Sequence, residues 1–411
     1  MRRISALASI LAASITASCA RCDPPRGTPD AGRPIAPEVI TLLPAPRPWT
    51  FTRVRLDTGI ALPEGCRLRA PIARAEISGL TRFVAEPRSP GTLIIADATD
   101  ASPPALTGVA AVSLDPEGVT RDPVPLPWLE PGALPRLARA GARWIAAIDR
   151  PGADSAKVML WRGAEAEQIG EGDGFEAIDL ACDPSKEGRC ALLTSRPLKV
   201  SAPGATVWIG APSERARAWK PFEIVPAAPD SDARPLGLTL VDAERVDLAL
   251  IEKGAVVFHE ITASGARERA RVPAPHGAMD AIALPRPVIL AFASPTDEEG
   301  CAREGRPGVR ITREGASDID FALPASPAHG GLRRLARGAL ATWIAPVGCR
   351  VARKVVYALR IDEQGAPVGT PIPVGDAAAF AVATSGDDVD LWLQEQTSVT
   401  WVRARCAPKG G

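Results

Sequence analysis

Short apolar runs recur along this chain at a nearly constant spacing, each bounded by Gly, Pro or charged residues. In one of them, every second residue from Val355 to Ile361 is a large apolar one, which is the period-two pattern of a strand with one buried face. Seven such runs are marked by Ile94, Ile145, Ala191, Leu248, Ile289, Thr342 and Leu391. These markers lie 51, 46, 57, 41, 53 and 49 residues apart, a spread that loops of varying length produce.

A second strand-like run follows each marker, at 109–114, 158–161, 206–209, 256–259, 309–311, 355–361 and 399–402. A weaker segment rich in Pro and charge then follows, as at 367–374, and exposed outer strands are often protected in this way. Six tryptophans lie in or beside these runs, where we expect them to fill the core between neighbouring units.

Two further patterns support the same period. An apolar residue, three turn-forming residues and Gly recur, with the closing glycines Gly118, Gly265, Gly315 and Gly365 spaced 147, 50 and 50 residues apart. Arg-Leu-Ala-Arg occurs at 136–139 and 334–337, ahead of two tryptophans 199 residues apart. A period near 50 is the length of one four-stranded propeller blade, so we predict an all-β fold, a β-propeller of seven four-stranded blades. The alternatives are six or eight blades, an irregular β-sandwich, and a helix over 134–147.

The last predicted blade, 378–403, lacks a fourth strand, and the segment from Thr50 to Ala70 is available to supply it. Six cysteines lie in the predicted domain, and six cysteines permit 15 pairings. Blade positions select Cys182 with Cys190 across a hairpin, Cys301 with Cys349 in neighbouring loops, and Cys66 with Cys406 across the ring closure. Free buried thiols are the alternative.

The N-terminus resembles an export signal. Met1-Arg2-Arg3 is a charged start, and 4–17 is an apolar stretch too short to span a bilayer. It ends in Thr16-Ala17-Ser18-Cys19, which resembles the bacterial lipoprotein signal and implies lipidation of Cys19. Thr16 departs from the apolar residue of that family, and ordinary secretion with cleavage after Ala20 is the alternative. Cys22 stays without a predicted partner.

These segments give the domain organisation. We predict a signal peptide at 1–18, a Pro-rich disordered tether at 19–48, one propeller domain at 49–406 and a short tail at 407–411. The 48 basic and 48 acidic residues leave no net charge, which argues against nucleic acid as a partner. We expect a monomer that is exported, contacts the membrane through its lipid anchor only, and has an envelope protein or polymer as its partner.

Candidate functional residues are few. His259, His276 and His329 are isolated, and no nucleophile elbow, phosphate loop or metal-binding signature occurs, so no catalytic residue, metal or cofactor is predicted. Three long loops after marker strands, 97–107, 195–205 and 294–308, share one face and form the predicted binding surface. Its candidate residues are Asp97, Asp100, Asp297, Glu298, Arg303 and Arg306, and plain solvated loop charge is the alternative.

Two hypotheses of function follow. The first is a non-catalytic envelope lipoprotein that uses a propeller face for binding, similar in build to the propeller lipoproteins that assist outer-membrane assembly. The second is an exported hydrolase or lyase that acts on a sugar or cell-wall fragment at the central channel. The second requires two carboxylates, or a histidine with a partner, to converge on the propeller axis.

Overall fold

The computed structural model describes residues 52–53, 60–76, 82–85, 94–98, 108–114, 120–125, 136–140, 143–150, 156–162, 165–172, 176–183, 188–195, 204–226, 233–242, 244–294, 301, 305–396 and 398–407. In this part of the chain all regular structure is β-strand except one turn of 3-10 helix, η1 (Ala216–Ala218). None of the described helical structure is long and apolar enough to cross a membrane. All of the strands belong to one compact unit that starts at Leu43.

Six of the sheets are four-stranded and antiparallel, and in each of them strands that follow one another in sequence are neighbours. The first three, blades 1 to 3, consist of β4 (Arg82–Ala85), β5 (Ile94–Ala98), β6 (Gly108–Leu114), β7 (Thr120–Pro125); β8 (Arg136–Ala140), β9 (Arg143–Arg150), β10 (Ala156–Arg162), β11 (Glu165–Gly172); and β12 (Glu176–Cys182), β13 (Cys190–Ser195), β14 (Ala205–Gly210), β15 (Lys220–Val225). Blades 4 to 6 consist of β16 (Arg234–Leu240), β17 (Val246–Glu252), β18 (Ala255–Thr262), β19 (Gly265–Pro273); β20 (Ala278–Ile282), β21 (Val288–Phe292), β22 (Gly308–Arg313), β23 (Ile319–Ala322); and β24 (His329–Arg334), β25 (Ala339–Pro346), β26 (Lys354–Ile361), β27 (Pro367–Asp376).

The seventh sheet joins the two ends of the domain. Its C-terminal strands are β28 (Ala379–Ser385), β29 (Asp388–Glu395) and β30 (Ser398–Cys406). On the outer side of β30 lie β2 (Cys66–Leu68) and β3 (Ala73–Glu76), and β1 (Thr52–Arg53) pairs with β3. The N-terminal segment therefore completes the last blade, as predicted, although β3 lies just beyond the predicted limit of Ala70.

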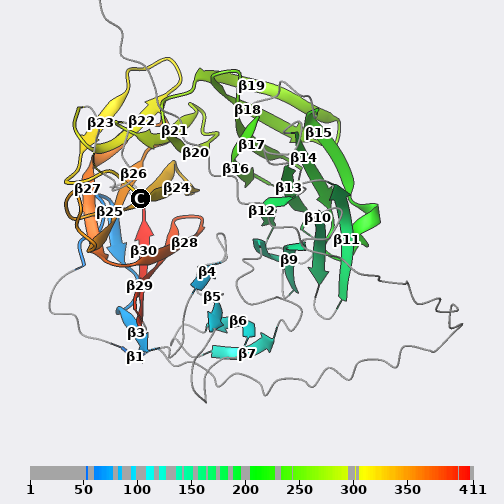
Figure 1. Cartoon of the computed structure of the whole chain (residues 1–411), viewed down its shortest axis with the longest axis horizontal. Coiled ribbons are helices and arrows are strands. Elements are labelled where there is room, and N and C mark those ends of the chain that lie inside the picture. The colour runs from blue at the N-terminus through cyan, green and yellow to red at the C-terminus, as the bar shows by residue number, and fades with distance from the viewer. Residues whose placement is uncertain are drawn as a thin grey trace, which may run out of the picture. The chain divides into compact units, whose positions relative to one another are not determined.

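The sheets surround a common axis (Figure 1). First strands of successive sheets contact one another from β8 through β28, and β28 contacts β4, so the first strand of each blade lies next to the axis. All seven marker residues lie on the second strand of their sheet, and the runs that follow them lie on the third. The seven-bladed propeller is thus confirmed, and the helix over 134–147 is wrong, because β8 and β9 pair there as an antiparallel hairpin.

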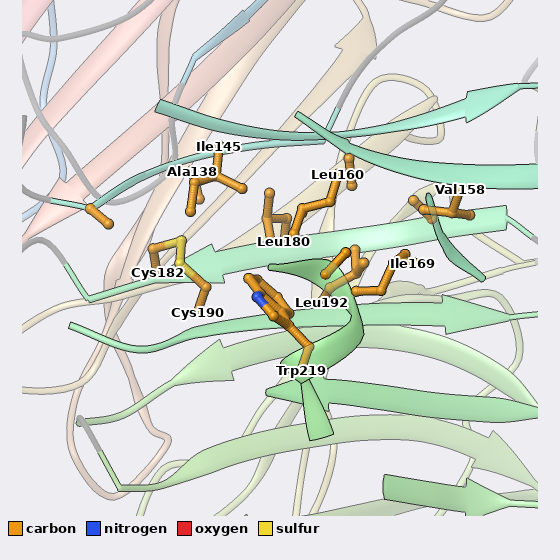
Figure 2. Packing of buried hydrophobic residues seen from close by; sticks show 14 residues of the cluster. Ala138, Ile145, Val158, Leu160, Ile169, Leu180, Cys182, Cys190, Leu192 and Trp219 are labelled. Atoms are coloured by element: carbon orange, nitrogen blue, oxygen red, sulfur yellow. A yellow bond between two sulfur atoms is a disulfide. The ribbon is translucent and has the colours of Figure 1, made fainter. Parts of the chain in front are cut away.

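Among the residues whose burial is described, apolar side chains hold neighbouring blades together from blade 2 through blade 7, because these sheets pack face against face. Figure 2 shows this packing between blades 2 and 3, where Ile145 and Leu160 meet Leu180 and Leu192. Trp219, which directly follows η1, covers the same cluster and is only 2% exposed.

Three disulfides join the six cysteines of the described residues, with the predicted pairing. Cys182–Cys190 closes the β12–β13 hairpin (Figure 2), and Cys301–Cys349 links the loops after β21 and β25. Cys66–Cys406 joins β2 to β30 and so closes the ring covalently. Disulfides persist in oxidising compartments, which agrees with an exported protein.

Candidate functional site

The predicted binding loops lie largely outside the described residues. Arg306 is described, and its carbonyl accepts a 2.7 Å hydrogen bond from the Ser294 hydroxyl. Asp97 belongs to β5. The binding role of this face stays a prediction, since the other candidate residues and the lipidation site lie outside the described part: Asp100, Asp297, Glu298, Arg303 and Cys19.

A cavity of about 250 Å³ lies next to the axis. It is formed where the first strands of blades 3, 4, 6 and 7 end and turn toward their second strands, on the face opposite the predicted binding loops. Its walls are residues 179–181 of β12, 238–240 of β16, 332–336 at the end of β24, and 384–386 at the end of β28. Four blades therefore contribute to one recess.

Polar groups in this recess come from the same four strands. Arg333 and Arg334 are adjacent on β24, Asp179 lies on β12, and Thr239, Thr384 and Ser385 add hydroxyls. Arg333 Nη1 donates to the Leu332 carbonyl at 3.0 Å, and Arg334 Nη1 donates to the Ala283 carbonyl at 3.1 Å. The two guanidinium groups are thus positioned by backbone oxygens.

A second axial carboxylate, Asp280 on β20, is buried beside the recess and does not belong to its walls. Its Oδ1 accepts from the backbone N–H of Ala281 and its Oδ2 from the backbone N–H of Leu332, both at 2.7 Å. Arg333 Nη1 lies 3.7 Å from the same Oδ2. Asp280 therefore ties the first strand of blade 5 to that of blade 6.

The backbone of the first strands around Asp280 leaves room for its carboxylate. β12, β16 and β20 each carry a β-bulge, and the residues just after the bulges are Asp179, Gly237 and Asp280. A Cβ on Gly237 would lie 2.7 Å from Asp280 Oδ1 and 3.0 Å from the Ala281 carbonyl oxygen. Glycine is needed at 237 because the Asp280 carboxylate occupies the space of a side chain.

Burial raises the pKa of Asp280 to about 6, against the opposing effects of Arg333 and the two backbone N–H donors. Asp179 adds a smaller effect in the raising direction. A carboxyl with a raised pKa near the axis is one part of what the hydrolase hypothesis requires, which is two carboxylates, or a histidine with a partner, that converge on the axis. Both oxygens of Asp280 are nevertheless engaged by backbone donors, and the group faces strands β16 and β24 instead of the recess.

A group of charged residues outside the recess walls interacts electrostatically with Arg334. Asp247 on β17 is 2% exposed and lies 3.7 Å from Arg245 Nε and 3.8 Å from Arg269 Nη1. Burial raises the pKa of Asp247, and these arginines together with Arg334 oppose the rise. Burial also lowers the pKa of Arg334, which Asp247 partly offsets. Asp247 is therefore shared between Arg245 and Arg269, and it also interacts electrostatically with Arg334.

The histidines supply no alternative centre. Burial lowers the pKa of His259, and it lowers that of His329, whose ring stacks on Phe380 at 5.2 Å. In the part of the chain that the structure describes, no group of three His, Cys, Asp or Glu residues is arranged to hold a metal ion.

The sequence offered no reason to expect a recess at the axis, although its wall residues 334–336 belong to the repeated Arg-Leu-Ala-Arg segment. One signal marked Asp179 in the wall and Asp280 beside it: Ile178-Asp179-Leu180 and Met279-Asp280-Ala281 both place an acid inside an apolar run, 101 residues or two blades apart. In both, the aspartate Oδ1 accepts the N–H of the next residue. Arg333 and Arg334 carried no comparable signal, because arginine also ends many exposed strands.

No protein-family model matches the sequence, and no curated protein matches it. Among solved structures, the fold is similar to a subtype N11 neuraminidase-like protein of influenza A/flat-faced bat/Peru/033/2010 (H18N11), at a TM-score of 0.44 and 10% identity over 86% of this chain and 92% of that one. It is also similar to the β-propeller domain of the trilobed protease from Pyrococcus furiosus, at a TM-score of 0.40 and 11% identity over 80% and 97% of the two chains. A chain from a structural and mechanistic study of two prolyl endopeptidases gives a TM-score of 0.41 and 15% identity over 77% of this chain and 45% of that one. At this level the matches concern the fold alone and say nothing of activity.

Proposed function

We propose that this protein is an exported lipoprotein, anchored by a lipid on Cys19, whose propeller is a non-catalytic binding module. Its partner is a protein or polymer of the cell envelope, bound by the monomer, and nucleic acid is not a ligand. The axial recess on the face of the first-to-second-strand turns is the site that we assign to binding.

The observation that carries this proposal is that the carboxylate of Asp280 is engaged in hydrogen bonds and does not line the recess. A general acid or base must reach the proton that it transfers, within about 3 Å or through one water. Asp280 instead accepts one backbone hydrogen bond from its neighbour Ala281 and one from Leu332 of the next blade, and it is absent from the recess walls. The recess walls present two arginines, hydroxyls and one carboxylate, Asp179, whose Oδ1 already accepts the Leu180 N–H. This set binds and orients a ligand, and it lacks the pair of carboxylates that the hydrolase hypothesis requires.

Site-specific photo-crosslinking in cells tests the binding role. A photoreactive residue at Ser385, which is exposed at the rim of the recess, is compared with one at Ala352, exposed in the loop after β25 on the opposite face. We expect one dominant envelope product from position 385. A dominant product from 352 alone would transfer the binding role to the predicted loop face. Products from neither position would contradict the docking function.

The anchor is tested separately. Cys19→Ser should move the protein from the membrane fraction to the soluble fraction, because the thiol is the proposed attachment point of the lipid. Fractionation and immunoblotting give the distribution, and Cys22→Ser is the matched control, which should leave it unchanged. Membrane retention of the Cys19 variant would rule out lipid attachment at this residue.

A further inference from the structure

Arg333 and Arg334 both line the axial recess. Each guanidinium carries five N–H donors, and one nitrogen of each is engaged by a backbone carbonyl. Among the described residues, no carboxylate lies within hydrogen-bond distance of either group. The nearest is Asp280 Oδ2, 3.7 Å from Arg333 Nη1, and both of its oxygens already accept backbone hydrogen bonds.

The balance of charge in the recess favours an anion. Its walls contain two guanidinium groups and one carboxylate, Asp179, whose Oδ1 accepts the Leu180 N–H. Asp280 and Asp247 lie outside these walls, and Asp247 is shared with Arg245 and Arg269. Both arginines are half-buried, and Arg333 has Asp280 at 3.7 Å as its nearest carboxylate, so an anionic ligand would add charge-assisted hydrogen bonds to donors that these contacts leave over.

The size and the remaining polar groups narrow the ligand class. A volume of about 250 Å³ lies below the range of about 300–1,000 Å³ that holds drug-sized ligands, so the ligand, or the part of it that enters, is small. Thr239 and Ser385 offer hydroxyls, and the free oxygen of Asp179 can accept a hydrogen bond from a ligand hydroxyl. The recess therefore suits an acid that also carries hydroxyl groups.

We propose that the axial recess binds a small hydroxylated organic anion, whose carboxylate or phosphate group is held by Arg333 and Arg334 and whose hydroxyls contact Asp179, Thr239 and Ser385. This inference rests on the proposed binding function and names the ligand class of the same site. An anion at the end of an envelope polymer and a free small molecule present the same chemistry to these residues.

Isothermal titration calorimetry on the mature full chain tests the proposal, with sodium glucuronate and inorganic phosphate as anionic probes and glucose as the neutral match. We expect glucuronate to bind and glucose not to bind. Arg333→Gln and Arg334→Gln should each weaken glucuronate binding at least tenfold, and added salt should weaken it further. Arg337→Gln is the matched control, because Arg337 is exposed four residues beyond Arg333 and lies outside the recess walls.

Folding of each variant is checked by circular dichroism and thermal unfolding, and Arg333→Lys provides a variant that keeps the charge but loses the two-pronged geometry. Absence of heat with both anions, equal binding of glucose, or binding that survives both glutamine variants would overturn the proposal. Crosslinking from Ser385 is repeated on the glutamine variants. If the crosslink persists but no anion binds, the proposal of a hydroxylated anion as ligand is wrong, whereas the proposed binding of an envelope partner is retained.

Discussion

At the scale of single residues, the ionisation of Asp280 makes the stability of the propeller depend on pH. The acid has an ordinary pKa of 3.8 and a pKa of about 6 in the folded protein, because burial penalises its charge. The folded state thus holds this proton more tightly than the unfolded chain. Its contribution to stability is complete below pH 3.8 and is lost as the pH rises to about 6, by about 3 kcal/mol at 1.4 kcal/mol per pH unit.

Asp280→Asn should therefore flatten the pH dependence of stability. The difference in free energy of unfolding between wild type and variant should change by up to about 3 kcal/mol between pH 4 and pH 7, with the wild type losing stability on the alkaline side. Urea unfolding at a series of pH values measures this difference. Asp179→Asn serves as the comparison on the equivalent bulge of blade 3, and parallel curves for wild type and Asp280→Asn would refute the role of Asp280.

At the scale of elements, the seams between blades carry the apolar packing. η1 bridges blades 2 and 3, since the Ala216 N–H donates to Glu167 Oε2 at 2.6 Å and Trp219 covers the shared cluster. Gly210 is needed there, because a Cβ at this position would lie 2.4 Å from the Trp219 ring. In blade 7 the stacked pair Trp392 and Trp401 fills the interior, and Trp401 Nε1 donates to the buried Asp390 at 2.9 Å.

Trp219→Ala should lower the free energy of unfolding by about 3–5 kcal/mol, because it removes a large buried side chain and leaves a cavity. Chemical denaturation measures the loss. Trp208→Ala is the matched variant: its ring is only half-buried against the same cluster, so its loss should be clearly smaller. Equal losses would show that Trp219 does not hold the seam.

The sequence patterns predicted the positions of strands and turns more accurately than which residues pair between neighbouring strands. The glycines at 265, 315 and 365 adopt positive φ in the turns between third and fourth strands of blades 4 to 6, as their spacing predicted. The two Arg-Leu-Ala-Arg segments are not equivalent, however. Residues 136–139 lie within β8 and Arg139 pairs with Trp144, whereas 335–337 form a turn and Trp343 pairs with Gly330. Register depends on cross-strand partners, which a repeated string of four residues does not encode.

At the scale of the whole molecule, the propeller is a ring that needs both ends of the chain. The last sheet pairs β30 with β29 on one side and with β2 and β3 on the other. Cys66–Cys406 reinforces this closure over a separation of 340 residues, whereas Cys182–Cys190 spans only 8.

The two disulfides should therefore contribute differently to the free energy of unfolding. If a disulfide acts mainly by restricting the unfolded chain, Cys66→Ala with Cys406→Ala should cost about 5 kcal/mol, and Cys182→Ala with Cys190→Ala about 2–3 kcal/mol. Thermal and urea unfolding of the two double variants under identical oxidising conditions gives the comparison. If removing Cys66–Cys406 lowers the free energy of unfolding no more than removing Cys182–Cys190, the strands of the last sheet keep the ring closed without the disulfide.

The sequence by itself determined the repeat and its length, and from these it predicted seven blades over six or eight, the closing segment and the cysteine pairs. These features follow from local alternation and spacing, which are properties of neighbouring residues and survive in a linear string. Only the tertiary structure decided that Asp280 bridges two blades through backbone N–H groups, and that Arg333, Arg334 and Asp179 share one recess. Asp179, Asp280 and the two arginines come from blades 3, 5 and 6. The physical reason they meet is the closure of the ring, which brings first strands together across one to two hundred residues of chain.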